Sequence, residues 1–296
     1  MRMTGTDRGV GDDLVAGAGD EVEAKARVLR AFGQIAPTYG SGLEFFDVFG
    51  RDLVAAAGIR AGERVLDLAC GRAACVRPAS EAVGVRGHVL GIDLSPAMVE
   101  LASEDLRRNN ISNAEVRVGD AESLELANDS FDVVMRGFGV FFFPEPAVAV
   151  MESRRVLRSG GRFAASTFAD GALDYPWLAD LVAEIAVGSE QESQLRGAAA
   201  AMRRPLLNAE GMSQILSETR FEGVAITTRE RRFVFADLDA YLLWVRSHCV
   251  GAVLNALGEQ DWERFRQACV RRLKDHQAPD GYELIKQANF TVAHRP

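Results

Sequence analysis

The chain has 296 residues, a formal net charge of −8 and a hydrophobic fraction of 48%. The acidic balance argues against a nucleic-acid partner, because phosphate binding needs clustered lysine and arginine. The length and apolar content fit one large α/β domain, or one such domain with a helical addition.

The N-terminal part predicts two helices. Residues 1–20 carry too few large apolar side chains to pack, so we expect them to be disordered. Helices are expected over Glu21–Ile35 and Leu43–Ala57. The segment Ala36–Gly40 between them contains a proline and must turn.

Strands and helices then alternate, which predicts a parallel sheet wound with helices on both faces. The pair Ser95-Pro96 is typical of a helix start, with a capping residue followed by proline. We expect the glycines of Ser159–Gly161 to end a helix over Val148–Leu157. The expected strands are Val65–Leu68, Val89–Ile92, Ala114–Val118, Phe131–Arg136 and Arg162–Phe168.

The pattern becomes largely helical after Phe168. Expected there are helical sequence over Asp170–Arg204, broken by Pro176, a helix over Ala209–Glu218, a strand over Val224–Phe235, helices over Asp237–Leu257 and Gln260–His276, and a last strand over Phe290–Ala293. We interpret the segments 21–57, 170–207 and 237–277 as helical caps over the carboxyl edge of the sheet, within one domain of residues 21–296.

The remaining composition favours a reduced, cytoplasmic protein. The N-terminus is rich in glycine and aspartate rather than basic and then apolar, so we expect no signal peptide. Charged residues and prolines interrupt the most apolar region, Val133–Val150, so we expect no membrane span. The four cysteines have neither zinc nor disulfide spacing and are Cys70, Cys75, Cys249 and Cys269.

The most informative stretch is a buried strand that ends in Asp67 and continues into a turn of small residues, Ala69–Ala73. An open α/β sheet binds its cofactor at such a place. The turn lacks the G-x-G-x-x-G pattern that a pyrophosphate needs, and Asp67 would repel a phosphate and attract an ammonium group. S-adenosylmethionine has an amino-acid end, a nucleoside end and no phosphate, so it suits this turn.

Two further acids close the next two strands. Asp93 lies 93 − 71 = 22 residues after Gly71, close to the spacing at which a carboxylate reaches a ribose hydroxyl. Asp120 follows the third strand and can accept from the adenine amino group, while the Ala121 backbone can donate to a ring nitrogen. The fourth strand ends near Phe138, where the amino-acid part of the cofactor and the substrate would meet.

These motifs together resemble the class I S-adenosylmethionine-dependent methyltransferases. The resemblance spans about Phe32 to Arg295 and is strongest to the branch with the ubiquinone/menaquinone-biosynthesis C-methyltransferases and bacterial small-molecule methyltransferases. It implies a Rossmann-like, mostly parallel seven-stranded sheet with helical insertions over the active site. Its markers are Val65–Gly71, Gly91–Met98, Gly119–Glu122, Phe131–Val134, Phe142–Pro146 and Arg155–Arg162.

The resemblance also implies residue roles in binding the cofactor. The turn from Asp67 would hold the methionine part, and Tyr39 would reach over the sulfonium. One departure concerns Gly71-Arg72-Ala73, where the family usually has Gly-Thr-Gly. The expected cofactor residues are Tyr39, Asp67, Ala69, Gly71, Asp93, Leu94, Met98, Gly119, Asp120, Ala121, Arg136 and Phe138.

Aromatic residues of the helical caps are the expected acceptor site. An apolar lining favours a bulky, partly aromatic or polyketide-like small molecule. Methyl transfer needs mainly in-line alignment, with His248 or Tyr39 as candidate bases. A structural role for His248, and core packing of Phe141–Phe143, are the alternatives. The expected acceptor residues are Phe142, Tyr175, Trp177, Tyr241, Trp244 and His248.

The sequence thus predicts an S-adenosylmethionine-dependent methyltransferase that acts on a small molecule, such as a secondary metabolite or a quinone-like compound, and releases S-adenosylhomocysteine. No metal, nucleic-acid partner or membrane partner is expected. The sequence leaves the oligomeric state open, a homodimer included. Three alternatives stay open: a cyclase or rearrangement catalyst on the same scaffold, a nicotinamide oxidoreductase, and a non-catalytic binding protein.

Overall fold

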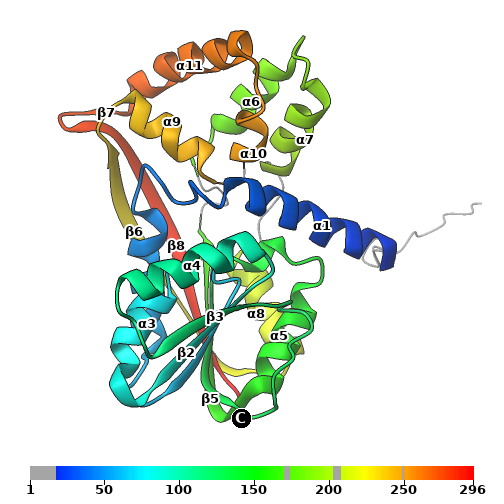
Figure 1. The fold of residues 1–296 in the computed structure, drawn as a ribbon, viewed down its shortest axis with the longest axis vertical. Helices are drawn as coiled ribbons and strands as arrows, with labels where there is room; N and C mark the ends of the chain where they lie inside the picture. Colours follow the sequence, from blue (N-terminus) through cyan, green and yellow to red (C-terminus); the bar gives the residue numbers. More distant parts are fainter. Residues whose placement is uncertain (1–17, 170–173, 203–207, 249) are drawn as a thin grey trace, which may run out of the picture.

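The computed structural model of the protein describes residues 18–169, 174–202, 208–248 and 250–296. The expected disorder of residues 1–20 therefore falls largely outside the described residues, as does Cys249. Figure 1 shows a sheet with helices on both faces and a helical cap above it. The main elements are α1 (Ala18–Ile35), α2 (Phe45–Ala57), β1 (Arg64–Leu68), α3 (Val76–Val83), β2 (His88–Asp93), α4 (Pro96–Arg108), β3 (Ala114–Val118), β4 (Phe131–Gly137), α5 (Pro146–Val156), β5 (Leu157–Phe168), α6 (Leu178–Ala186), α7 (Glu192–Met202), α8 (Ala209–Glu218), β6 (Glu222–Phe235), α9 (Leu238–Arg246), α10 (Gly251–Leu254), α11 (Glu259–Leu273), β7 (Gln277–Ala278) and β8 (Gly281–His294).

The strands form one mixed sheet in the order β3-β2-β1-β4-β5-β8-β6, and β7 pairs with β8 as an eighth strand. Strands β1 to β5 run parallel, while β8 is antiparallel to both β5 and β6. The predicted doubly wound, mostly parallel sheet is confirmed. In the register of β1 and β2, Asp67 lies opposite Gly91 and Leu68 opposite Ile92, so the two carboxyl ends meet at one edge.

Both faces of the sheet are covered, which explains why most residues of its central strands β1 and β4 are apolar. Side chains alternate between the faces, so Val65 joins the apolar cluster under α2 and α3, whereas Leu66 and Leu68 join the cluster with α5 and α8. Ser95 starts α4 as predicted, since its hydroxyl accepts from the Met98 N–H at 3.4 Å. This helix start directs α4 away from the carboxyl end of β2.

Several predicted boundaries were wrong. The fifth strand starts at Leu157 rather than Arg162, so Ser159–Gly161 lie inside β5 and do not end a helix. The last strand starts at Gly281 rather than Phe290, because β8 pairs with β6 along a ribbon whose outer half is only partly buried and lacks a continuous apolar run. The helix expected over Asp237–Leu257 is interrupted after Arg246. There the Ser247 hydroxyl donates to backbone carbonyls of Trp244 and Ser41. The helix expected from Glu21 already starts at Ala18.

Helices α6, α7, α9, α10 and α11 form the cap (Figure 1). The ribbon of β6 and β8 runs from the sheet up to this cap, and α1 lies between the cap and the carboxyl edge of the sheet. Helix α1 contacts α4 below it and α10 above it. The cap therefore closes over the edge where the acidic strand ends lie. Within the segment 21–57, which was also expected to be a cap, α2 instead packs against β4, β5 and β8. In the described residues, no helix is both long and apolar enough to cross a membrane.

A buried carboxylate organises the cap core. Asp174 is 3% exposed and accepts from the Trp244 indole at 3.0 Å and the Tyr241 hydroxyl at 3.3 Å. His248 Nε2 lies 3.4 Å from the same carboxylate. The Lys286 ammonium donates to the Asp174 carbonyl at 3.2 Å. The Asp174 carboxylate thus binds α9, while the backbone carbonyl of the same residue binds Lys286 of β8.

Removing this carboxylate should destabilise the cap. We expect Asp174→Ala to cost at least ~3 kcal/mol of unfolding free energy, because several buried polar groups lose their acceptor. Asp174→Asn should cost less, since it keeps one acceptor oxygen. The control Asp239→Ala removes an α9 carboxylate that is 82% exposed and should cost less than ~1 kcal/mol. Urea unfolding measures all three; equal midpoints for Asp174→Ala and wild type would contradict this account.

Candidate functional site

Two connected cavities lie at the carboxyl edge of the sheet. The first, here named the α1 compartment, runs beneath α1 and along the ends of β2, β3 and β4. The second, named the Asp67 compartment, is lined by Asp67, the turn after β1 and charged side chains of α2, α3 and α4. Both cavities share lining residues, which makes them one continuous site. The shared residues are Tyr39, Ala69, Gly71 and Gly137.

The turn after β1 is held in an unusual backbone conformation. Ala69, Gly71 and Ala73 all have positive φ, at 54°, 50° and 65°. Alanine in this region costs about 1–2 kcal/mol relative to its preferred backbone, so surrounding contacts must hold the turn. The Gly71 N–H donates to Asp93 Oδ2 at 2.8 Å, and the Cys70 N–H donates to the Ile92 carbonyl at 3.1 Å.

Ala73 does not crowd the site. Its side chain is fully buried in the apolar cluster beneath α2 and α3, and it lines neither compartment. The alanine methyl that replaces the usual glycine hydrogen therefore points into the core. Arg72, the other departure from the family turn, does line the Asp67 compartment.

Asp67 is a buried carboxylate that lacks a donor. It is 1% exposed, and among the described residues neither of its oxygens has a hydrogen-bond partner. Burial, followed by the nearby charge of Asp93, raises its pKa well above the ordinary value. An unpaired buried carboxylate is costly. A cationic ligand group in this compartment would remove that cost.

Asp93 ties the turn to the next helix. Its Oδ2 accepts from the Gly71 N–H, and its Oδ1 accepts from the Ser95 N–H at 2.9 Å. Burial raises the pKa of Asp93, and these two backbone donors act in the opposite direction. Each carboxylate oxygen has a further lone pair, so Asp93 can still accept from a ligand hydroxyl in the α1 compartment.

Asp120 carries the ion pair that fastens α1 over its compartment. The Lys25 ammonium lies 2.8 Å from Asp120 Oδ2 and 2.7 Å from Glu122 Oε2. Asp120 Oδ1 also accepts from the Glu122 N–H at 2.9 Å. Lys25 and Glu122 line the cavity, and the sequence analysis missed both. Only the folded chain brings α1 to this loop, so no local pattern indicates the contact.

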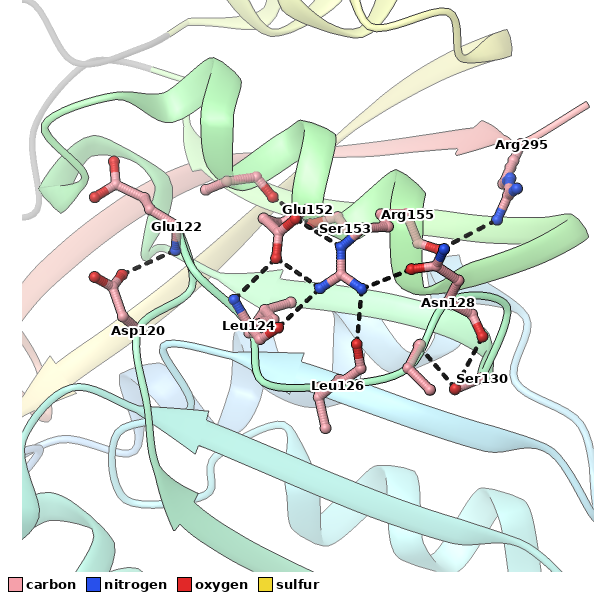
Figure 2. Close-up of polar contacts among 12 residues, drawn as sticks. Asp120, Glu122, Leu124, Leu126, Asn128, Ser130, Glu152, Ser153, Arg155 and Arg295 are labelled. Carbon is pink, nitrogen blue, oxygen red and sulfur yellow. Dashed lines mark hydrogen bonds and ion pairs between the residues drawn. The ribbon is translucent and has the colours of Figure 1, made fainter.

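The loop that carries Asp120 is fixed from behind by Arg155 of α5, as Figure 2 shows. Its guanidinium donates to the carbonyls of Leu124 and Leu126 at 2.8 and 2.7 Å. It also pairs with Glu152, whose carboxylate accepts from the Leu124 N–H at 2.9 Å. Arg155 thus holds the loop through two carbonyls and, through Glu152, one N–H.

All predicted cofactor residues except Arg136 line one of the two compartments. Arg136 is a correction: alternation along β4 points it toward α5, where Nη2 donates to the Ala149 carbonyl at 3.0 Å and to Ser153 Oγ at 2.8 Å. Its guanidinium lies 5.0 Å from the Phe143 ring centre. Burial lowers the pKa of Arg136 to about 9.

The expected acceptor residues of the cap are a second correction. The sequence analysis assigned these cap aromatics to the acceptor site, but their polar atoms have partners within the fold: the Tyr175 hydroxyl donates to the Glu283 carbonyl of β8, and the Trp177 indole donates to His276. These aromatics are cap core rather than cavity wall. Phe142 differs, since it lines the α1 compartment. The residues that line neither compartment are Tyr175, Trp177, Tyr241, Trp244 and His248.

The comparison with known families decides the class of this protein. A family described as a methyltransferase domain matches residues 59–217, more than half of the chain. The chain belongs to this methyltransferase family. It is an S-adenosylmethionine-dependent methyltransferase, and the cyclase alternative is not favoured.

Similar curated proteins are methyltransferases of small molecules. The aklanonic acid methyltransferase DauC of Streptomyces sp. (strain C5) is 40% identical over 155 residues, which cover 52% of this chain and 70% of that protein. The nocamycin O-methyltransferase of Saccharothrix syringae is 37% identical, with 44% and 47% covered. The demethylmenaquinone methyltransferase of Staphylococcus carnosus is 32% identical, with 46% and 58% covered. The matches span less than two thirds of the latter two proteins.

Solved structures support the fold. The YcgJ protein of Bacillus subtilis superposes with a TM-score of 0.55 at 19% identity, covering 84% of this methyltransferase and 99% of that chain. The [4+2]-cyclase SpnF superposes with a TM-score of 0.51 at 18% identity, with 84% and 80% covered. At such identities the likeness concerns the fold alone.

The residues of the site fit the cofactor. Asp67 offers two free acceptor oxygens for an ammonium group, while Asp93 and Asp120 present carboxylates along the adjoining compartment. Met98, Phe138 and Phe142 add apolar walls there. Across the described ranges, no group of three or more His, Cys, Asp or Glu side chains is arranged to hold a metal ion.

Loss of the Arg155 contacts to the loop that carries Asp120 should weaken binding of the adenine group of the cofactor. We expect Arg155→Gln to weaken binding of S-adenosylhomocysteine about 10-fold, because a loosened loop no longer fixes Asp120. Binding of S-inosylhomocysteine, which lacks the 6-amino group, should change less. The control Arg154→Gln removes a neighbouring α5 arginine whose Nε donates to the carbonyl of the exposed Arg220 at 3.4 Å. Calorimetric titration tests this; equal losses for both ligands would contradict a role for the loop in reading adenine.

Proposed function

We propose that the cofactor lies across both compartments, with its methionine end in the Asp67 compartment and its adenosine end beneath α1. The single observation that carries the proposal is the buried Asp67 carboxylate, which has no hydrogen-bond donor within the described ranges. An ammonium group would supply the missing positive charge and the hydrogen bonds together. Asp93 then accepts from the ribose hydroxyls, and Asp120 with Ala121 reads the adenine edge.

The α1 helix gives the adenosine end its cover. Phe32 packs edge-on against Phe142, with ring centres 4.9 Å apart, and both line the α1 compartment. Leu94 and Met98 complete the apolar lining around the base. Lys25 closes this side by pairing with Asp120 and Glu122. Water is thereby excluded from the place where the adenosine end is proposed to lie.

The acceptor is proposed to be a bulky small molecule with aromatic or quinone-like character. Relatives named for aklanonic acid, nocamycin and demethylmenaquinone support this class. Aromatic rings at the junction of the compartments support it as well. Tyr39 stacks on Phe46 with ring centres 4.9 Å apart, and Phe46 lies 6.4 Å from Phe138. These rings take over the role that the sequence analysis gave to the cap aromatics.

Alignment is the proposed source of catalysis. When bound, S-adenosylmethionine supplies a methyl group on a positively charged sulfur, so the protein need not activate the leaving group. Tyr39 lines both compartments and is placed to confine the acceptor beside the cofactor. His248 is 2% exposed and lies against Asp174 in the cap core. We therefore propose that His248 is no base in this reaction. A cytoplasmic location and a single domain over residues 21–296 stay predictions, and the oligomeric state stays open.

Asp67 should trade stability for binding. We expect Asp67→Asn to weaken S-adenosylhomocysteine binding about 10- to 100-fold, since a charge-assisted contact is lost. The same variant should melt at or above the wild-type temperature without ligand, because it removes an unpaired buried charge. The control Asp132→Asn changes a buried carboxylate that accepts from the Arg64 N–H at 2.7 Å. It should lower the melting temperature and leave affinity unchanged. Wild-type protein that binds neither S-adenosylmethionine nor S-adenosylhomocysteine would refute the proposed function.

Stability and affinity should respond to pH in opposite ways. The folded-state pKa of Asp67 is raised above the unfolded value, so the folded protein binds more protons between those two pKa values. The stability of the ligand-free protein should fall as pH rises above ~4. Affinity for S-adenosylhomocysteine should rise as Asp67 loses its proton. Both pH dependences should be reduced in Asp67→Asn; melting curves and titrations across pH that are identical in both proteins would contradict this.

Tyr39 should act through its ring. We expect Tyr39→Phe to keep kcat within about 3-fold, while Tyr39→Ala lowers it about 100-fold by loosening the alignment. Initial-rate assays of methyl transfer to the acceptor measure both. A large loss of kcat in Tyr39→Phe, with a shifted pH profile, would instead indicate that the hydroxyl takes part in proton transfer.

A further inference from the structure

Arg72 is the residue at which this chain departs most from the turn that its family uses. The position usually holds threonine, and here it holds the longest cationic side chain. In the folded protein Arg72 lines the Asp67 compartment, and its side chain is only 25% exposed. A charged side chain at this depth needs charged or polar partners.

The guanidinium is anchored on two sides. Nη2 lies 2.5 Å from Asp105 of α4, and Nη1 donates to the Pro37 carbonyl at 3.5 Å. Its Nε is buried and has no hydrogen-bond partner in the part of the chain that the structure describes. A buried donor without an acceptor destabilises the folded protein, because it has lost its hydrogen bonds to water. The anchored arginine thus retains an unused donor at the cavity.

The backbone around Arg72 is fixed as well. The preceding Gly71 N–H donates to Asp93, and the Arg72 carbonyl accepts from Arg77 Nη1 at 3.0 Å. Arg77 is the other arginine that lines this compartment, but its Nη2 pairs with Asp47. Of the two arginines, Arg72 is the one with a buried donor that lacks an acceptor.

The unused donor of Arg72 and the unused acceptors of Asp67 lie in the walls of one compartment. Arg72 already pairs with Asp105, but its cationic guanidinium keeps one unused donor that suits an anion, and the unused oxygens of Asp67 suit a cation. A free α-amino acid group carries both of these charges on one carbon. Neither a bare amine nor a bare carboxylate would satisfy both walls.

We propose that Arg72 binds the α-carboxylate of the cofactor while Asp67 binds its α-ammonium group. The inference rests on the proposed function, because it assumes that the methionine end enters this compartment. Arg72 then provides, from the turn itself, the charge that a threonine at this position cannot provide. The turn becomes selective for ligands that carry an intact amino-acid end.

Three ligands separate the two charges. S-adenosylhomocysteine carries both groups, S-adenosyl-3-thiopropylamine keeps the amine but lacks the carboxylate, and 5′-methylthioadenosine lacks both. Calorimetric titration of the full chain should show that Arg72→Gln weakens S-adenosylhomocysteine binding about 10- to 100-fold. Binding of the other two ligands should change by less than about 3-fold. Arg72→Lys should lie between Arg72→Gln and wild type for S-adenosylhomocysteine, since it keeps the charge but not the geometry.

The control is Arg108→Gln, which removes a second arginine from Asp105. Its guanidinium lies 2.9 Å from Asp105 Oδ1 and is 64% exposed, outside both compartments. This variant should bind all three ligands as wild type does. Melting curves of every variant verify that the proteins are folded at the titration temperature.

The outcomes distinguish this inference from the proposed function. Wild-type protein that binds none of the three ligands overturns both. Wild-type protein that binds S-adenosylhomocysteine while Arg72→Gln weakens all three ligands equally, or none, overturns only the role of Arg72. Loss of carboxylate discrimination in Arg77→Gln instead of Arg72→Gln would assign the contact to Arg77 and also overturn it.

Discussion

The Gly71 N–H donates to Asp93 across 2.8 Å, and this hydrogen bond joins the turn after β1 to the end of β2. The other oxygen of the same carboxylate holds the Ser95 N–H at the start of α4. One half-buried side chain thereby fixes a turn in which two alanines adopt positive φ, and it sets the direction in which α4 leaves the sheet. Both compartments form around this junction.

The junction leaves Asp67 without a donor at the end of β1. The ligand-free protein therefore bears the cost of a buried carboxylate whose pKa is raised by burial and by Asp93. Buried polar groups usually have hydrogen-bond partners, and the exceptions are commonly found at binding sites. Asp132, which is buried in the same sheet, does have partners: it accepts from the Arg64 N–H and pairs with Arg158.

The cap separates two kinds of aromatic residue. Rings on α9 and beside α6 gather on Asp174 and fill the cap core, whereas rings from α1, α2 and the end of β4 surround the cavities. The first group gives the cap rigidity through a buried charge, and the second forms the walls. Since α1 lies between the cap and the sheet, it contributes to the cavity from a segment far away in sequence (Figure 1).

The sequence by itself determined the alternating α/β fold, the central strands and the carboxylates at the ends of β1 and β2 and just after β3. These are local signals: a short apolar run, a turn and an acid follow each other within ten residues, and parallel strands bring their carboxyl ends to one edge. For the same reason, all of the cofactor residues that the sequence predicted, except Arg136, line one of the two compartments.

Only the tertiary structure decided which way a side chain faces where the sequence pattern allows it to face either the core or the cavity. Arg136 points toward α5. Because β4 is buried on both faces, the composition of the strand does not show which of its side chains face the cavity. The spacing of the cap aromatics Tyr241 and Trp244 places them on one face of a helix, which is compatible with a core or a cavity wall. Asp174, some 70 residues away in sequence, accepts the hydrogen bonds of both side chains and thereby fixes them in the cap core. Lys25 reaches Asp120 across 95 positions, a contact that exists only once the chain has folded.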